Sequence, residues 1–254
     1  VIMAIFAPIF ATFDPNTTDL LNIRTSPNKV HILGTDDLGR DIFSRLLYGG
    51  RVSIAVGVAS MILQILIGVT IGVIAGYFGG LIDKIIMRIV DIIMCFPFFV
   101  IAIALAAVIG GSITNLVLII GMLMWPVITR IVRGEVLVTK QNEYILAAKA
   151  LGFNTFEIII HHIIPNIISA ILVSSTLCIA QGILMEATLS FLGLGVNPPT
   201  PSWGNMLVAA QNMSVLSHKW WMWIPAGMSV VLIVLSVNFV GDGLRDALDV
   251  EKSV

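Results

Sequence analysis

The sequence predicts an all-α membrane protein built from long apolar helices. Of its 254 residues, 57% are apolar and only 11% are charged, and the mean hydropathy is +1.00. A soluble domain carries about 25% charged residues. The charged residues are also segregated, so that long runs contain none. Because a helix needs about 20 apolar residues to cross a hydrocarbon core about 30 Å thick, this pattern predicts several membrane spans.

The order of apolar and polar runs predicts the elements of the chain. Residues 1–12 are too short to span and lack the features of a signal peptide, so we expect them to be part of a first transmembrane helix that begins before this numbering. Residues 13–51, rich in Asp, Asn, Thr, Pro and Gly, predict an extracytoplasmic loop. Five spans should follow within residues 52–241, interrupted by a cytoplasmic loop at 133–165, and residues 242–254 should form a short charged cytoplasmic tail.

The five spans are expected where charges are absent. Gly110-Gly111-Ser112 should break one long uncharged run into two antiparallel spans, and a tryptophan cluster should open the last span as an interfacial aromatic belt. The expected spans are Val52–Gly76, residues near 92–109, residues near 114–132, Ile163–Met185 and Trp220–Gly241.

The loop between the third and fourth of these spans is the most informative segment. Its pattern predicts two short amphipathic helices. Asn142 can cap the first helix, and Gly152 is expected to end it. Asn154 and Glu157 have the spacing of a capping box that begins the second helix. Pro165 lies where the second helix is expected to meet the next span.

The first loop helix is expected to present one flat face. Tyr144, Ala147, Ala148 and Leu151 share that face by their spacing of three and four residues. The small alanine side chains would let another protein approach closely. The alternative is a helix that lies on the lipid headgroups.

The same segment resembles the "EAA" loop of ABC importer permeases, in which an Ala-Ala pair is followed by a glycine and then by a hydrophobic-Pro ending. The glutamate that names the motif is replaced here by Leu146, so its role does not carry over. The residues that match are Ala147, Ala148, Gly152, Ile164, Pro165 and Asn166.

Further segments resemble the subfamily that serves dipeptides, oligopeptides and nickel, and together they cover most of the chain in the same order. They are Leu33–Ser53, Gly79–Pro97, Phe191–Leu207 and Gly241–Asp249. The chain therefore resembles the C-type permease subunit of a dipeptide or oligopeptide ABC importer, in the family of binding-protein-dependent transport system inner membrane components. Nickel or glutathione import remains an alternative.

This resemblance implies a fold, partners and a site. The fold is the type I ABC importer transmembrane domain, with six spans in the native chain, in a bacterial or archaeal plasma membrane. The partners are a second homologous permease, two cytoplasmic ATPase subunits that bind ATP and Mg²⁺, and an extracytoplasmic substrate-binding protein. This chain would bind no cofactor itself. The residues that would couple it to an ATPase are Tyr144, Ala147, Ala148, Lys149, Gly152 and Pro165.

Polar residues within the spans are candidates for the substrate pathway. Glu186 is the main one, because an ionisable residue inside a membrane is a functional hypothesis by default. Gln181 and Asn115 are weaker candidates. The alternative for all three is a structural hydrogen bond between helices. Separately, the glycines at 68, 72 and 76 form a small-xxx-small stripe that predicts close helix packing.

Other classes of function are less well supported by the sequence. The chain has no G-x-x-x-x-G-K-[ST] phosphate loop and no H-E-x-x-H motif, and its histidines and cysteines have no metal-ligand spacing, so we expect neither an enzyme nor a metal site. The net charge of −1 offers no basic patch for nucleic acid. A self-contained secondary transporter is the main competitor, although internal repeats and an intramembrane charge path are not evident.

Overall fold

The computed structural model describes residues 2–250, and the side chains up to Leu248. Val1 and residues 251–254, the end of the predicted tail, lie outside the described residues. Within the described part, the chain is helical, with an isolated bridge between Thr35 and Asp41 as its one element of β type. The all-α prediction is confirmed for this part of the chain.

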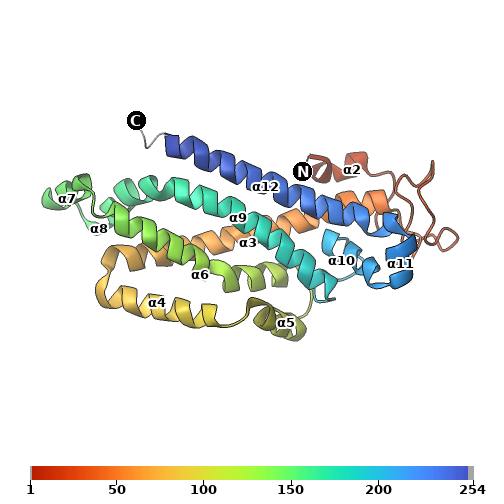
Figure 1. Ribbon diagram of the computed structural model, residues 1–254, viewed down its shortest axis with the longest axis horizontal. Helices are drawn as coiled ribbons and strands as arrows, with labels where there is room; N and C mark the ends of the chain where they lie inside the picture. The colour runs from red at the N-terminus through yellow and green to blue at the C-terminus, as the bar shows by residue number, and fades with distance from the viewer. Residues whose placement is uncertain (1, 251–254) are drawn as a thin grey trace. The chain divides into compact units, whose positions relative to one another are not determined.

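Twelve α-helices are described, and Figure 1 shows their course. Short 3₁₀ turns at Val208–Gln211 and Trp220–Met222 and a π-helix at Ile159–Ile163 join some of them. The α-helices are α1 (Ile2–Ile5), α2 (Ala7–Phe10), α3 (Ile42–Phe78), α4 (Gly80–Cys95), α5 (Phe98–Ile109), α6 (Ile113–Thr139), α7 (Glu143–Ala150), α8 (Thr155–Ile158), α9 (Ile164–Phe191), α10 (Trp203–Leu207), α11 (Met213–His218) and α12 (Ile224–Val250).

Four helices are long and apolar enough to cross a membrane, and the number becomes five if the bent pair α4–α5 counts as one span. The four are α3, α6, the continuous helix from Thr155 to Phe191, and α12 as far as Leu248. Five spans after residue 52 are therefore found only when the bent pair is included.

The chain divides into two compact units, and the long helices run through both. The first unit contains residues up to Ala59, Ile103–Ile119 and Ile179–Ser236. The second contains Ser60–Ala102, Ile120–Cys178 and the residues from Val237 onward.

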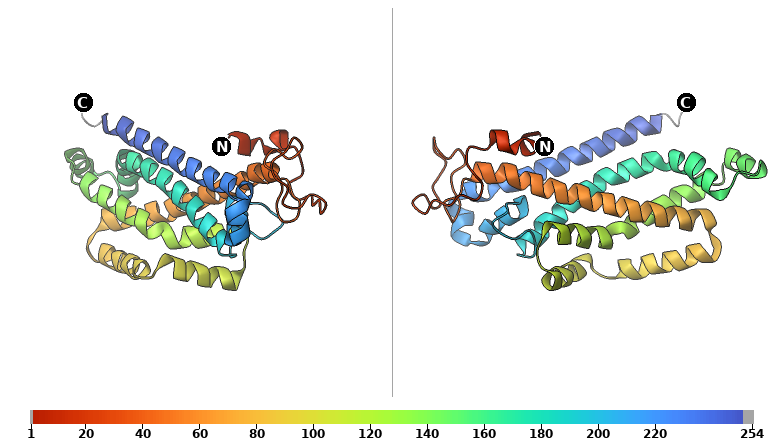
Figure 2. Two further views of the ribbon diagram at one scale, coloured as in Figure 1. Left: turned by 45° about the vertical axis from the view of Figure 1, so that its right-hand side comes forward. Right: turned by 180° about the vertical axis from the view of Figure 1, so that it is seen from behind.

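In the first unit, the polar N-terminal segment folds against α3, α10 and α11 (Figure 2). Ile42 at the start of α3 is buried with Met206 and Val215. Arg45 is also buried, and its guanidinium donates to the carbonyl oxygens of Pro15, at 3.0 Å, and Pro199, at 3.4 Å. The polar segment has little regular secondary structure, and these bonds hold it in place.

Helix α3 begins at Ile42, ten residues before the predicted start at Val52, so the predicted 13–51 loop is helical at its end. The reason is a cap that composition did not reveal. The Asp41 carboxylate accepts the Ser44 N–H at 2.8 Å, as an N-cap residue does. The buried charge of Arg45 in the first turn is balanced by Asp36, whose Oδ2 lies 3.5 Å from Arg45 Nε, and by the two backbone carbonyls.

In the second unit, the glycine stripe packs α3 against α6, as the small-xxx-small pattern predicts. A Cβ added at Gly72 would lie 2.9 Å from Thr129 O and 2.9 Å from Val132 Cβ, and Gly68 and Gly76 make equally close approaches. The Arg133 Nη2 donates to Asp83 Oδ2 at 2.6 Å, which joins α6 to α4. The packing partner of the stripe therefore lies within this chain.

The span predicted near 92–109 is wrong over residues 92–97. Residues 92–95 belong to α4, and α5 begins only at Phe98 after a bend of 79°. Pro97 explains the break, because it disfavours the helical conformation at the preceding residue. Phe96 is accordingly extended, with ψ at 136°. The predicted break at Gly110 is confirmed, since this residue ends α5 with φ at +88°.

The three remaining spans also differ at their ends. Helix α6 contains the span predicted near 114–132 and continues to Thr139, so the predicted 133–165 loop is helical at its start. Helix α9 continues to Phe191, beyond the predicted end at Met185. Helix α12 begins at Ile224, so the tryptophan cluster lies in the 3₁₀ turn before it. Helix α12 also continues past Gly241 to Val250, which joins the predicted tail to the span.

Candidate functional site

The candidate site is the loop formed by α7 and α8, which follows α6 and precedes α9. Gly152 ends α7 with φ at +86°, a conformation that glycine adopts at low cost. The Phe153 N–H donates to the Ala148 carbonyl at 3.2 Å and the Gly152 N–H to the Lys149 carbonyl at 3.1 Å. These two bonds form a Schellman motif, which confirms the predicted end of the helix.

Asn142 stands at the N-cap position with an extended backbone, as predicted, but its side chain does not cap the helix. Its amide donates instead to the Tyr144 hydroxyl at 3.2 Å. The position of the first residue of α7 is therefore right, and the predicted side-chain hydrogen bond is wrong.

The two sides of α7 differ sharply in exposure. Ile145 is 0% exposed and Ala148 is 5% exposed, whereas Tyr144, Ala147 and Leu151 lie on the outward side. The predicted flat face with both alanines is thus wrong in one respect: only Ala147 faces outward. Ala148 lies one turn after Ile145 and shares its buried side.

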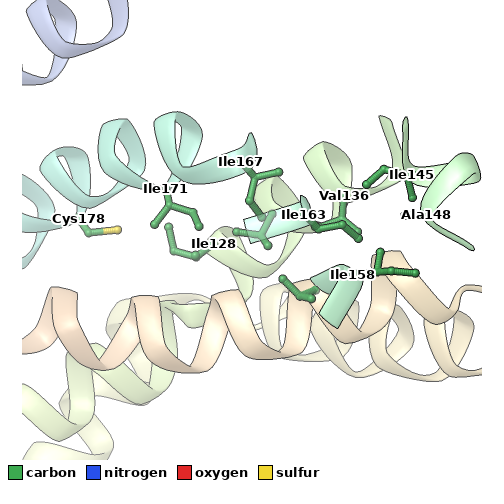
Figure 3. Close-up of a cluster of buried hydrophobic side chains, with 11 residues drawn as sticks. Ile128, Val136, Ile145, Ala148, Ile158, Ile163, Ile167, Ile171 and Cys178 are labelled. Atoms are coloured by element: carbon green, nitrogen blue, oxygen red, sulfur yellow. The ribbon is translucent and has the colours of Figure 1, made fainter. Parts of the chain in front are cut away.

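The buried side of α7 belongs to a continuous apolar core in the second unit. Figure 3 shows the cluster as a row of side chains that runs from Cys178 of α9 to Ala148 of α7. Val136 of α6 and Ile158 of α8 are members, and each is almost completely buried. Cores of this kind are packed as densely as organic crystals and transmit displacement with little compression. Helix α7 therefore shares one packed core with α6 and α9.

Helix α8 begins with the predicted capping box. The Glu157 N–H donates to Asn154 Oδ1 at 2.9 Å, and the Asn154 N–H donates to Glu157 Oε2 at 3.0 Å. This reciprocal pair satisfies two backbone donors and fixes where the helix starts.

Pro165 lies in the first turn of α9, at the predicted junction with the span, but it does not interrupt the helix. The helix from Thr155 continues to Phe191 through the π-helix Ile159–Ile163. A π-helical turn shifts the hydrogen-bond pattern just before the proline, whose nitrogen cannot donate. The Asn166 side chain donates to the His162 carbonyl at 2.6 Å, which helps to satisfy this turn.

Large apolar side chains are exposed on the loop. Leu151 is 77% exposed at the end of α7, and Phe156 is 73% exposed in the first turn of the helix Thr155–Phe191. We define the outward loop surface as the exposed residues Tyr144, Leu146, Ala147, Leu151, Phe153 and Phe156. An exposed apolar patch of this kind marks a site of protein–protein or membrane contact.

Lys149 lies on α7 beside this surface, and its ammonium stands 5.2 Å from the centroid of the Tyr77 ring of α3. This distance suits a cation–π interaction. The predicted coupling residues Tyr144, Ala147 and Lys149 are therefore exposed, whereas Ala148 is an anchor.

The sequence analysis missed the deeper anchors of the loop, Ile145 and Ile158. Both are essentially inaccessible to solvent and belong to the apolar core. The available signal was the spacing of Ile145 and Ala148, three residues apart on one face. The face that contains Tyr144, Ala147 and Leu151 has the same spacing, so periodicity alone did not show which face of α7 is buried.

Glu186, the main pathway candidate, lies in the first unit and is 0% exposed. Its carboxylate accepts hydrogen bonds from Ser53 Oγ and Ser190 Oγ, both at 2.7 Å. Ser53 Oγ in turn accepts the Trp203 N–H at 3.1 Å. This geometry favours the structural alternative for Glu186, and the pathway role stays a prediction.

The other two pathway candidates are not gathered with Glu186. Asn115 donates to the carbonyls of Ile109, at 3.2 Å, and Gly110, at 2.9 Å, which satisfies the end of α5. Gln181 lies on α9 and is exposed. Their contact with a substrate also stays a prediction.

The comparison with known families decides the identity. A family described as "Binding-protein-dependent transport system inner membrane component" matches residues 68–252. The chain belongs to this family.

Curated relatives agree with the family over nearly the whole chain. The chain is 45% identical to an oligopeptide transport system permease protein of Bacillus subtilis, over 98% of this chain and 81% of the relative. It is 43% identical to a putative peptide permease protein of Brucella suis, over 95% of this chain and 80% of the relative. It is also 43% identical to a glutathione transport system permease protein of Shigella flexneri, over 98% of this chain and 82% of the relative.

A solved structure supports the fold. An inward-facing form of the MetNI methionine ABC transporter matches with a TM-score of 0.66 and 17% identity, over 80% of this chain and 95% of that chain. This likeness shows the transmembrane fold of a type I ABC importer, as the sequence resemblance implied. This family member is therefore a multi-pass inner-membrane permease component of a transport system. Among the side chains that the structure describes, no group of His, Cys, Asp or Glu is placed to hold a metal ion.

Proposed function

We propose that this permease carries short peptides across the membrane as one half of the translocation pathway of an ATP-driven importer. The relatives named for oligopeptide and glutathione transport support this substrate class, because glutathione is itself a short peptide. A second, homologous permease would form the other half. An extracytoplasmic binding protein would deliver the peptide, as the family description implies for its members.

The observation that carries the mechanism is the two-sided structure of α7. Its inner side is anchored through Ile145 and Ala148 in the core that also contains residues of α3, α6 and α9. Its outer side presents the outward loop surface, which is apolar and exposed. We infer that a cytoplasmic ATPase subunit binds this surface, and that a pair of such subunits binds ATP and Mg²⁺.

In this mechanism the nucleotide biases a two-state equilibrium of the spans. ATP-driven closure of the ATPases would displace α7, and the packed core would pass the displacement to α6 and α9. Coupling of this kind requires that the ATPases contact the two states of the permease differently. The permease itself would contribute no step of ATP hydrolysis.

The test is a matched pair of added charges. Ala147→Glu places a carboxylate on the outward loop surface at an exposed position, so we expect normal membrane insertion but loss of ATPase copurification and of peptide uptake. Gln141→Glu adds the same charge at an exposed position before α7 and should leave both unchanged. Normal uptake by Ala147→Glu would contradict the coupling role.

The energy source separates this proposal from a secondary transporter. Proteoliposomes that contain the assembled importer should take up a radiolabelled dipeptide when ATP is supplied to the ATPases. Collapse of the proton gradient should not reduce this uptake. Uptake that follows the proton gradient and ignores ATP would show that the competing class is correct.

A further inference from the structure

A groove of about 340 Å³ in the first unit lies between α1 and α3. The two helices approach closely beside it, because a Cβ added at Gly50 of α3 would lie 3.1 Å from Ala4 Cβ of α1. Figure 2 shows α1 next to the beginning of α3. One charged side chain contributes to the walls, and the rest of the lining is apolar. The residues that line the groove are Ala4, Ile5, Arg51, Ile54, Ala55 and Val58.

Arg51 is exposed and supplies the charge of the groove. Its guanidinium carbon lies 5.9 Å from the centroid of the Tyr48 ring. A cation–π contact of this kind uses the face of the ring and leaves the five N–H donors of the guanidinium unused. Within the part of the chain that the structure describes, no carboxylate pairs with the Arg51 guanidinium and no carbonyl accepts from it. These donors can therefore bind an anion.

The position of Arg51 along α3 places its charge at the membrane surface. The segment directly after it, Val52–Gly76, contains no charged residue and exceeds the length of about 20 apolar residues that a span needs. Ile54, Ala55 and Val58 follow Arg51 by three, four and seven residues, so they lie on the same face of α3 and extend from the charge into the span.

The opposite wall of the groove is also apolar. Ile5 of α1 lines it and is 58% exposed. The groove therefore combines a cation at the level of the lipid headgroups with an apolar channel at the level of the acyl chains. This arrangement matches the two parts of a phospholipid.

We propose that this groove binds an anionic phospholipid, with the phosphate at Arg51 and one acyl chain along Ile54 and Val58. A guanidinium binds a phosphate through two parallel hydrogen bonds, and the long arginine side chain can direct its charge toward the headgroups. A soluble phosphate would engage Arg51 but would leave the apolar lining unused. The charge complementarity and the lining together favour the lipid.

The test measures the retention of phosphatidylglycerol, and of phosphatidylcholine with the same acyl chains, by the purified importer complex in native mass spectrometry. Both lipids contain a phosphate, but only phosphatidylglycerol has a net negative charge. We expect one phosphatidylglycerol to be retained about fivefold more strongly than phosphatidylcholine, which is the effect of one arginine near a membrane surface. Glycerol 3-phosphate, which has no acyl chains, should not compete. Equal retention of the two lipids, or competition by glycerol 3-phosphate, would overturn the proposal.

Matched variants assign the effect to the groove. Arg51→Gln should abolish the preference for phosphatidylglycerol, and Arg51→Lys should keep part of it. Lys29→Gln removes an exposed cation that does not line the groove and should change nothing. Ala55→Phe fills the groove without a change of charge and should weaken retention, whereas Leu66→Phe adds the same ring at an exposed position further along α3 and should not. An equal loss in Lys29→Gln and Arg51→Gln would indicate a general surface charge and overturn the assignment.

A labelling experiment identifies the occupant of the groove directly. Phosphatidylglycerol with a photoreactive diazirine in one acyl chain should label residues 54–58 of the wild-type complex, and this labelling should decrease in Arg51→Gln. If Ala55→Cys instead cross-links to the second permease or to another segment of this chain, and residues 54–58 take no lipid label, protein covers the groove and the proposal is wrong. Peptide uptake is a separate measurement, so failure of the lipid site would leave the proposed function standing.

Discussion

Replacing Gly72 with alanine should destabilise this permease, whereas the same replacement at Gly134 should stabilise it. Both glycines lie inside long helices, Gly72 in α3 and Gly134 in α6. They differ in what surrounds them. An added Cβ at Gly134 would meet nothing within 4 Å, whereas at Gly72 it would meet the facing helix.

The magnitude follows from the contact distances. The new Cβ of Gly72→Ala would lie 2.9 Å from Val132 Cβ and 3.0 Å from Val132 Cγ1. Carbon atoms pack at about 3.5–4.0 Å, so the helices must separate or shift. Overpacking of this kind costs about 1–3 kcal/mol. The helical preference of alanine over glycine offsets about 0.5–1 kcal/mol of this cost at Gly72 and acts unopposed at Gly134.

A buried thiol provides the assay. Cys178 is buried within the apolar core of the second unit, and Cys95 is exposed. In a Cys95→Ser background, a thiol-reactive fluorescent dye should label Cys178 only when that core opens on heating. We expect the labelling midpoint to fall for Gly72→Ala and to rise slightly for Gly134→Ala.

The order of the midpoints is the decisive result. If Gly72→Ala opens at the same temperature as Gly134→Ala, then α3 and α6 do not approach as closely as the contacts indicate. A fall for both variants would instead indicate that glycine at position 134 has a packing role with another chain.

Three further results are expected. Glu186→Ala should lower the melting temperature, because the Ser53 and Ser190 hydroxyls lose their acceptor, which costs about 1–3 kcal/mol of folding free energy. Glu186→Gln should lower the melting temperature less. An unchanged KM for uptake in Glu186→Gln would exclude a pathway role. Asp83→Asn breaks the partly buried ion pair with Arg133 and should lower the melting temperature. This decrease should be smaller at high salt. An equal decrease in melting temperature at all salt concentrations would contradict the electrostatic cause. At Gly152, asparagine should retain more uptake than alanine, because asparagine tolerates the left-handed backbone better; the opposite order would contradict the geometry at the end of α7.

The sequence predicted features that depend on nearby residues. The capping box of Asn154 and Glu157 and the glycine end of α7 involve groups within a few residues of one another, so spacing was enough to find them. The glycine stripe was found for a similar reason, since its spacing is regular along one helix. Even so, only the structure identified α6 as the packing partner.

Features that depend on distant residues were missed or misplaced. Which side of α7 faces inward is decided by Val136 and Ile158, and no periodicity within α7 could reveal these partners. The early start of α3 depends on the Asp41 cap and on the burial of Arg45, which bonds to the carbonyls of Pro15 and Pro199 and pairs with Asp36. Local composition pointed the other way because two of the groups that bond to Arg45, at Pro15 and Pro199, lie far along the chain.

The two sides of α7 separate two kinds of effect that a single loss of transport would confuse. A change on the outward side, at Ala147 or Leu151, removes no contact of the apolar core, so it should act through the ATPase alone. A change on the inward side, at Ile145, removes packing from the core and should lower stability as well as uptake, because deleting buried groups leaves a cavity. Measured together, stability and ATPase copurification therefore distinguish loss of the external contact from loss of the internal connection. A coupling helix needs both, since force applied to a surface with no packed interior behind it would move the loop and leave the spans in place.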